Sequence, residues 1–342
     1  MQRIGKYSII KNGEFKQDEA DVVILDSNVL IDIDKFYYRG ASSQSREDLR
    51  ALLHEFRKVD DLDYRYALME TCFKRTKCDA AHAVRMRNAI REMWIEDLEK
   101  IDMMLACESV IAGEGEVRSE NLFMESIFAN IIKLPDVFYV MYGTNLHMIM
   151  MYEKNQKDRG KAYSEHCRWV REELNCVSAY PRMVARSLFL GQSEENGRAR
   201  ALLKIDKKRM SIEDKAWNSA WDCFFMFVLD AYRMGEVGIV DEKWEGLPAR
   251  VVLITARDQV WIDSMSHFCG YGQKGKKKLP FLQNTLHIRK DYLETAHKEE
   301  ELDQGHHCRV LDEGGDINNV FEAIVRLENE LNILPRTIFD IG

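Results

Sequence analysis

The sequence predicts an α/β fold in which a parallel sheet carries a mostly helical insertion. Two fully apolar runs, Val22 to Leu25 and Val251 to Ile254, have the length and β-branched content of strands buried on both faces. The stretch between them, from 79 to about 196, has helical apolar spacing and few strand signals. We therefore expect a discontinuous core of residues 1–98 and 206–292, a helical insertion over 99–205, and a C-terminal segment over 293–342.

Composition narrows the class of protein. The chain has 342 residues, 46% of them hydrophobic, and a formal net charge of −8. That charge argues against a general nucleic-acid coat but leaves room for a local basic patch. Eight cysteines are scattered without a CxxC pair, which is typical of reduced thiols. No apolar signal core follows Met1, and the most apolar stretch, 137–151, is too short and polar to span a bilayer. We expect a soluble cytoplasmic protein.

Local signals place the elements of the first half of the core. Asn12-Gly13 predicts the turn of an edge hairpin. Val29 to Tyr37 has the pattern of a short helix, and Ser45 with Asp48 predicts the start of a helix that runs through Arg57. A further helix is expected from about Leu62.

The second half of the core is predicted in the same way. Ser211, with Asp214 three residues on, predicts the N-terminus of a helix that runs to about Met234. The glycine and lysine content of 270–278 indicates a loop, and 285–288 is a candidate strand. Asn318 to Leu331 is expected to form the final helix.

Four carboxylates stand out by their positions. Asp26 ends the first apolar strand, Asp258 follows the second, and Glu70 lies on a helix face that looks partly buried. Asp222 lies inside the strongly apolar segment 217–227. A charged carboxylate there costs several kcal/mol unless it is paired or bound to a metal. Simpler interpretations remain: helix caps for Asp26 and Asp258, a half-exposed helix residue for Glu70, and an ion pair or a protonated acid for Asp222.

Such a set of acids suits a hard cation. Mg²⁺ and Mn²⁺ prefer oxygen ligands, and a bound ion can activate water and neutralise the charge of a phosphate. The sequence therefore indicates a metal centre that acts on phosphate esters.

The order of these residues resembles that of the PIN-domain nucleases. A strand ends in Asp26-Ser27-Asn28, a helical Glu70 and a helical Asp222 follow, and a second strand ends in Thr255 before Asp258. The resemblance covers roughly 20–78 and 206–290, and two residues rather than one separate Thr255 from Asp258.

The resemblance implies a PIN-like α/β/α sandwich around a parallel sheet. It also implies metal-dependent hydrolysis of phosphodiester bonds, in RNA more often than in DNA. The Mg²⁺ or Mn²⁺ ions would be held by the catalytic acids Asp26, Glu70, Asp222 and Asp258. Candidate substrate contacts are Asn28, Thr255, Arg257, Lys274, Lys276, Lys277 and Lys278.

The function we expect is that of a metal-dependent nuclease, with a toxin-like or defence effector as one setting. The helical insertion would offer a surface to a second copy of the chain or to a regulatory protein. The alternative is a catalytically inactive PIN-like module for binding or scaffolding, which Asp222 paired to an arginine would favour. A HAD-like phosphatase is a weaker interpretation, because Asn28 stands where its second Asp would be.

Overall fold

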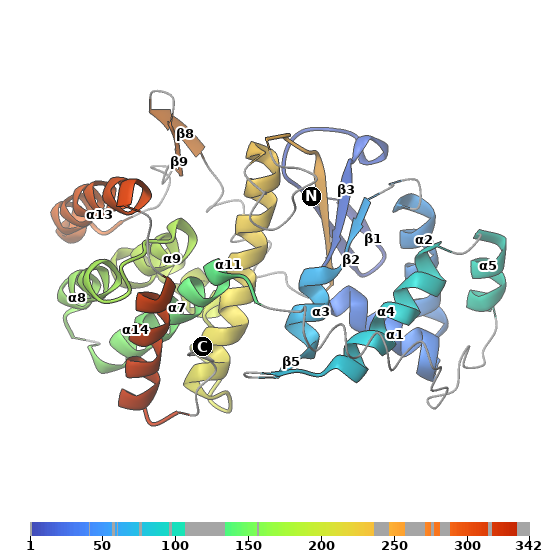
Figure 1. Ribbon diagram of the computed structural model, residues 1–342, viewed down its shortest axis with the longest axis horizontal. Helices are drawn as coiled ribbons and strands as arrows, with labels where there is room; N and C mark the ends of the chain where they lie inside the picture. Colours follow the sequence, from blue (N-terminus) through green and yellow to red (C-terminus); the bar gives the residue numbers. More distant parts are fainter. Residues whose placement is uncertain are drawn as a thin grey trace. The chain divides into compact units, whose positions relative to one another are not determined.

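The computed structural model describes the chain apart from residues 1, 41, 57–58, 60, 75–76, 96–97, 107–133, 156, 236–245, 257–270, 275–276, 281–287, 314–316 and 334–342. Its residues form two compact units (Figure 1). The first contains Met1–Leu134 and Val228–Asp258, and the second contains Pro135–Phe227 and Gln259–Gly342. The boundary lies within helix α11 (Ile212–Met234). This division differs from the expected core of 1–98 and 206–292. One boundary between the units falls inside an uninterrupted helix, so no break between elements marks it in the sequence.

The first unit is built on a mixed sheet of five strands in the order β1-β2-β7-β3-β4. The interior strand β3 (Val22–Leu25) runs parallel to both of its neighbours, β7 (Val251–Ala256) and the edge strand β4 (Asp61–Asp63). On the other side of β7, β2 (Tyr7–Lys11) and the edge strand β1 (Gln2–Ile4) pair in antiparallel fashion. The two predicted apolar strands are therefore confirmed, but the sheet as a whole is mixed rather than parallel.

The N-terminal hairpin turns earlier than predicted. Ile4 pairs with Tyr7, so the turn contains Gly5, whose φ of 54° suits glycine. Asn12, the expected turn residue, instead satisfies backbone groups next to the sheet. Its Nδ2 donates to the carbonyl oxygen of Ala249 at 2.9 Å, and its Oδ1 accepts from the backbone N of Val251 at 2.9 Å.

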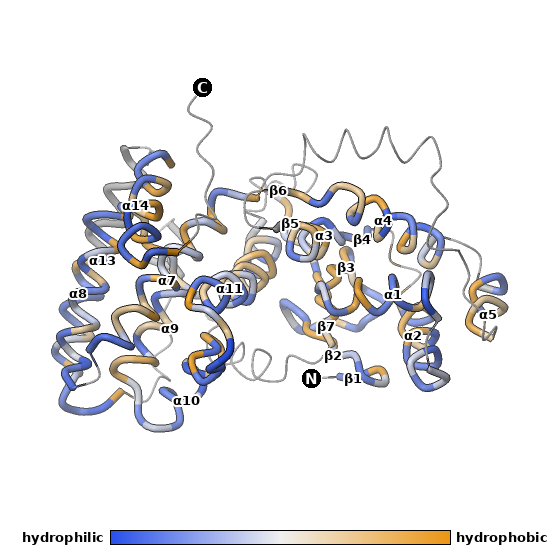
Figure 2. Tube along the Cα trace, turned by 90° about the horizontal axis from the view of Figure 1, so that it is seen from below, coloured by the Kyte–Doolittle hydropathy of each residue, from blue (hydrophilic) through white to orange (hydrophobic). Residues whose placement is uncertain are grey.

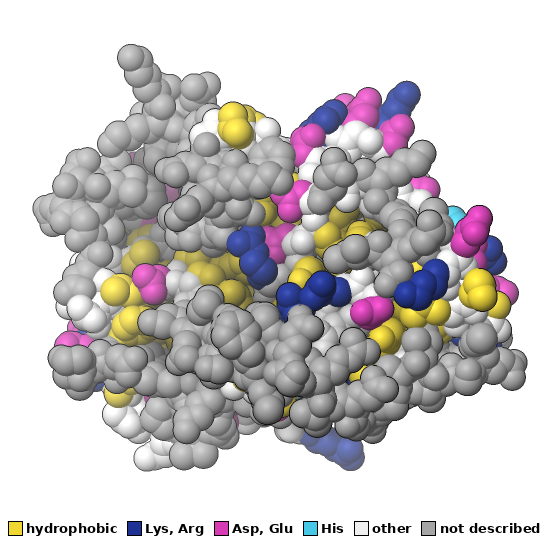
Figure 3. Space-filling model, turned by 45° about the vertical axis from the view of Figure 1, so that its right-hand side comes forward, with side chains coloured by type: hydrophobic (Ala, Val, Ile, Leu, Met, Phe, Trp, Pro, Cys, Tyr) yellow, Lys and Arg dark blue, Asp and Glu magenta, His cyan; other side chains and the backbone are white. Residues whose placement is uncertain are grey.

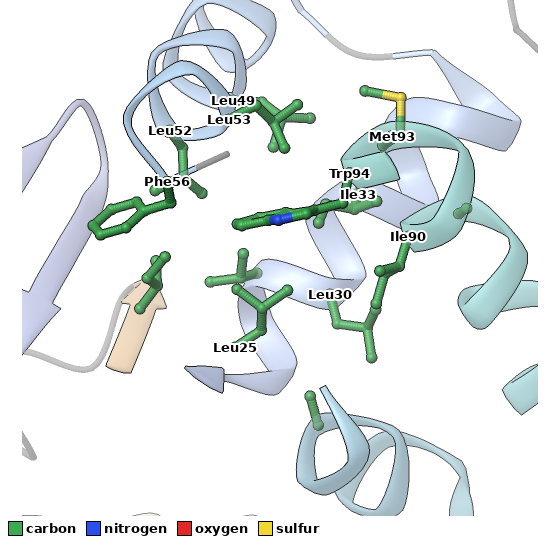
Figure 4. Close-up of a cluster of buried hydrophobic side chains, with 14 of the residues drawn as sticks. Leu25, Leu30, Ile33, Leu49, Leu52, Leu53, Phe56, Ile90, Met93 and Trp94 are labelled. Carbon is green, nitrogen blue, oxygen red and sulfur yellow. The ribbon is translucent and has the colours of Figure 1, made fainter. Parts of the chain in front are cut away.

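One face of this sheet packs against an apolar core. The helices that supply it are α1 (Ser27–Arg39), α2 (Ser43–Phe56), α3 (Arg65–Cys72), α4 (Ala80–Ile95) and α5 (Leu98–Ala106). Figure 4 labels ten of the core side chains, namely Leu25, Leu30, Ile33, Leu49, Leu52, Leu53, Phe56, Ile90, Met93 and Trp94. The helix expected from Leu62 begins at Arg65 instead, because Leu62 pairs with Val23 as part of β4.

Strand alternation assigns other side chains to the opposite face. Val23, Leu25, Ile254 and Ala256 belong to the core cluster, so Ile24 and Thr255 point the other way. This second face carries the polar residues discussed below.

The second unit is largely helical. Its helices are α7 (Asp136–Lys154), α8 (Arg159–Glu172), α9 (Ala179–Leu190), α10 (Ser193–Leu202), most of α11, α13 (Leu293–Glu313) and α14 (Ile317–Glu330). The residues of α7 are themselves buried along most of its length, whereas α8 is drawn largely in the blue of hydrophilic residues in Figure 2. Among the described helices, none is long and apolar enough to cross a membrane.

Two short hairpins are also present. β5 (Phe73–Lys74) pairs with β6 (Lys77–Cys78), and β8 (Tyr271–Lys274) pairs with β9 (Lys277–Pro280). Most of the predicted loop at 270–278 therefore belongs to the second hairpin. Its glycine and lysine content indicated a loop, but backbone pairing between strands does not depend on that content. Of the candidate strand at 285–288, only Ile288 is described, and it forms an isolated bridge with Gly191.

Candidate functional site

The carboxylate of Asp26 lies at the carboxyl edge of the sheet, where β3 ends. Neutral donors from Ser27, Asn28 and Thr255 contact it. The backbone N of Ser27 donates to Oδ1 at 2.7 Å, Asn28 Nδ2 donates to Oδ2 at 3.1 Å, and Thr255 Oγ1 donates to Oδ2 at 2.6 Å. Asp26 is only 7% exposed. Hydrogen bonds to an ionised acceptor are short and strong, so this arrangement favours a charged, oriented carboxylate.

Strand register explains why these residues meet. Leu25 of β3 pairs with Ile254 of β7, and the backbone N of Asp26 donates to the carbonyl oxygen of Ile254 at 2.9 Å. Thr255 is the next residue on β7 and points away from the apolar core. Asp26 also begins α1, as its capping interpretation predicts. Asn28 and Thr255, which we expected to contact substrate, therefore bind the carboxylate of Asp26.

A second buried acid, Asp63, lies on the same face of the sheet. It ends β4 and pairs in register with Ile24. Arg65 holds its carboxylate through Nε to Oδ1 at 3.0 Å and Nη2 to Oδ2 at 2.7 Å. Tyr232, from the last turns of α11, donates its hydroxyl to Oδ2 at 3.4 Å. The end of α11 therefore lies against this polar face.

Asp230, another buried acid of the first unit, is 3% exposed. Its Oδ1 lies 2.9 Å from Nη2 of Arg233 on the same helix. Glu70, one of the predicted acids, lies on α3 and is half-buried.

Asp222 has a different environment. It belongs to the second unit, where its Oδ2 accepts a hydrogen bond from Nζ of Lys204 at 2.9 Å. The prediction that this acid needs a partner in its apolar segment is met by an ion pair with a lysine. The four predicted acids are thus divided: Asp26 and Glu70 in the first unit, Asp222 in the second, and Asp258 outside the described residues.

The remaining predicted contacts are placed only in part. Lys274 belongs to β8, while Lys277 and Lys278 belong to β9. Arg257 and Lys276 lie outside the described residues. Figure 3 shows one face of the molecule, on which basic and acidic side chains of the described residues lie among apolar ones.

The described residues also bear on a metal centre. Within the part of the chain that the structure covers, no three His, Cys, Asp or Glu side chains form a group that could hold a metal ion. The oxygen donors present suit Mg²⁺ or Mn²⁺ in kind. Asp26 has the position expected of a ligand, and the cluster of four acids remains a prediction.

Sequence reasoning missed Asp63, Arg65 and Asp230. Asp230 follows Val228 and Leu229, an apolar context like the one that drew attention to Asp222. Asp63 had no such signal, because a strand of three residues is too short to show alternation.

Comparison with known proteins gives no family and no function for the chain. No protein-family model, curated protein or solved structure matches the chain.

Proposed function

We propose that the first unit is a PIN-like nuclease domain whose active site lies at the carboxyl edge of its sheet, with Asp26 as the leading metal ligand. The observation that carries the proposal is the Asp26 carboxylate, buried at the end of an interior parallel strand and oriented by hydrogen bonds from Ser27, Asn28 and Thr255. Ligands commonly bind at this edge of α/β sheets.

The chemistry of the donors fits Mg²⁺ or Mn²⁺ in part. Asp26 would hold the ion, with Glu70 on α3 and Asp258 after β7 as the other ligands that the PIN resemblance supplies. Asp222 is dropped from this set because Lys204 pairs with it. When bound, the metal would supply an activated water and stabilise charge on the phosphate. Thr255 and Asn28 would fix the orientation of the Asp26 carboxylate.

The substrate we propose is RNA in preference to DNA, and a toxin-like or defence role remains one setting for such an enzyme. Both points rest on the PIN resemblance alone.

The test is cleavage of labelled single-stranded RNA and DNA in Mn²⁺, Mg²⁺ or EDTA by wild type, Asp26→Asn and Asp222→Asn. We expect metal-dependent cutting that Asp26→Asn reduces by more than about 100-fold, since a ligand should matter at least as much as the groups that orient it. Asp222→Asn serves as the control, because its acid is already paired.

Each other result has a definite meaning. Cutting that survives Asp26→Asn would place the active site elsewhere. Loss of cutting only in Asp222→Asn, with the protein still folded, would restore the four-acid site as first predicted.

A second candidate function is a PIN-like module that binds nucleic acid or protein without catalysis. Two observations favour it: the Lys204 pair that occupies Asp222, and the lack of a three-acid group among the described residues. RNA binding by wild type without cutting in any metal would select this function.

A further inference from the structure

An exposed arginine is anchored beside the candidate site by a buried acid. Arg65 is 47% exposed, whereas its partner Asp63 is 3% exposed. Both oxygens of Asp63 accept from the guanidinium, and Oδ1 also accepts from the backbone N of Arg65 at 3.0 Å. The pair uses the Nε and Nη2 edge of the guanidinium.

The strand register places this arginine near Asp26. Asp63 of β4 pairs with Ile24 of β3. Asp26 comes two residues after Ile24, and Arg65 comes two residues after Asp63. Because β3 and β4 are parallel and neighbouring strands lie about 4.8 Å apart, both chains leave the sheet at the same edge. Arg65 therefore stands one strand away from the proposed metal ligand.

The chemistry of this arrangement suits a phosphate. A guanidinium presents several donors in a plane and binds phosphate oxygens in a directed way. A side chain already held in place loses less entropy when it binds, so an anchored arginine is a better contact than a mobile one.

We infer that Arg65 contacts a backbone phosphate of the nucleic acid bound at this edge, and that Asp63 and Tyr232 hold it in position for that contact. The inference rests on the proposed function for the identity of the ligand. It adds a substrate contact that does not depend on the metal.

The chain contains a matched control. Arg233 is 39% exposed and also pairs with a buried acid, Asp230, but it lies on α11 and not at the end of a sheet strand. Arg65→Gln and Arg233→Gln therefore remove the same charge from the same kind of pair. Arg65→Lys keeps the charge while losing the planar fork, and it guards against a fold defect caused by leaving Asp63 without a cation.

The measurement is the binding of fluorescein-labelled single-stranded RNA in EDTA across a salt series, so that no cleavage occurs. For Arg65→Gln we expect binding to weaken by about 3- to 10-fold for any RNA sequence, and the slope of log K against log salt to fall by about one. Arg65→Lys should keep most of that slope. Arg233→Gln should bind as wild type does.

The outcomes separate this inference from the proposed function. Equal affinity and slope for Arg65→Gln and Arg233→Gln would overturn it, and so would a wild type that binds neither RNA nor DNA. If wild type cleaves RNA but Arg65→Gln leaves KM and binding unchanged, the nuclease stands and the inference fails. If wild type binds RNA through Arg65 but never cleaves, the inference stands and the catalytic proposal fails.

Discussion

Two buried carboxylates, Asp26 in the first unit and Asp303 in the second, differ in the groups that hold them. In the first unit, Asp26 accepts from the hydroxyl of Thr255, the amide of Asn28 and a backbone N–H. In the second, Asp303 of α13 lies 2.7 Å from Nη1 of Arg171 and 2.6 Å from Nε of Arg182. The two arginines neutralise the charge of Asp303 and join separate helices through it, whereas the donors described at Asp26 are neutral and orient its carboxylate.

The charged network of the second unit attaches α13 to α8 and α9. Besides the contacts of Asp303, Nη2 of Arg171 lies 2.8 Å from Oε2 of Glu299. Burial opposes the charge of Arg182, but Cys167 and Asp303 raise its pKa above the ordinary value. Asp222, paired with Lys204, belongs to the same class of acid. Burial of an acid therefore does not by itself indicate a functional site. The groups that contact the acid must also be known.

The largest effect that we expect is on stability, from Asp303→Asn. This change leaves Arg171 and Arg182 without their shared carboxylate in a buried position. Removing one partner of a buried ion pair costs about 3 to 5 kcal/mol. Urea unfolding, followed by circular dichroism, measures the loss.

The control for that prediction is Glu173→Gln. Glu173 lies 3.1 Å from Arg326, and both side chains are more than half exposed. A surface pair of this kind contributes about 0 to 1 kcal/mol. Equal losses for the two variants would show that the buried network is no stronger than a surface pair.

The next effect concerns activity, and it contrasts Thr255→Val with Lys204→Met. Thr255→Val removes the 2.6 Å donor to Asp26 without changing the shape of the side chain. Loss of a residue that orients a metal ligand typically lowers activity by about 10- to 100-fold. Lys204→Met removes the cation beside Asp222 and should leave cleavage unchanged while lowering stability. Metal-dependent RNA cleavage and urea unfolding are measured for both variants.

The opposite pattern would invert the comparison. If Lys204→Met lowered cleavage and Thr255→Val did not, the acid of the second unit would be the functional one.

Sequence patterns located the long elements and the acid at the end of the first strand. The apolar runs that form β3 and β7 are short and rich in β-branched residues, a composition typical of buried strands. Ser211 caps α11 as predicted, because the backbone N of Asp214 donates to its Oγ at 3.2 Å. Such signals are local, so one sequence is enough to read them.

The partners of the acids could not be predicted in the same way. Lys204, the partner of Asp222, lies in a turn and has a φ of 55°. The sequence around Lys204 does not indicate this conformation. Asp63 meets Tyr232, which is 169 residues distant along the chain. These contacts depend on the packing of α11, and the spacing of residues in a sequence does not specify that packing.

The last effect concerns a buried histidine pair in the second unit, at which burial opposes protonation. His147 Nδ1 lies 3.0 Å from His166 Nδ1, and the ring of His147 stacks on Trp169. Burial lowers the pKa of His147 to about 3 and that of His166 well below its ordinary value. Both rings are therefore neutral in the folded protein at pH 5, while the unfolded chain protonates them below about pH 6.5.

The sign of the pH dependence follows from this difference. Between about pH 6.5 and 3 the unfolded state binds more protons, so the free energy of unfolding falls as the pH is lowered, by up to about 1.4 kcal/mol per pH unit for each histidine. We expect His147→Leu with His166→Leu to flatten the dependence between pH 6.5 and 5, relative to wild type, in urea unfolding. His297→Gln, at an exposed position, should keep the wild-type dependence. An unchanged slope in the double variant would mean that the pair is protonated in the folded protein, and the second unit would then tolerate unpaired buried charge.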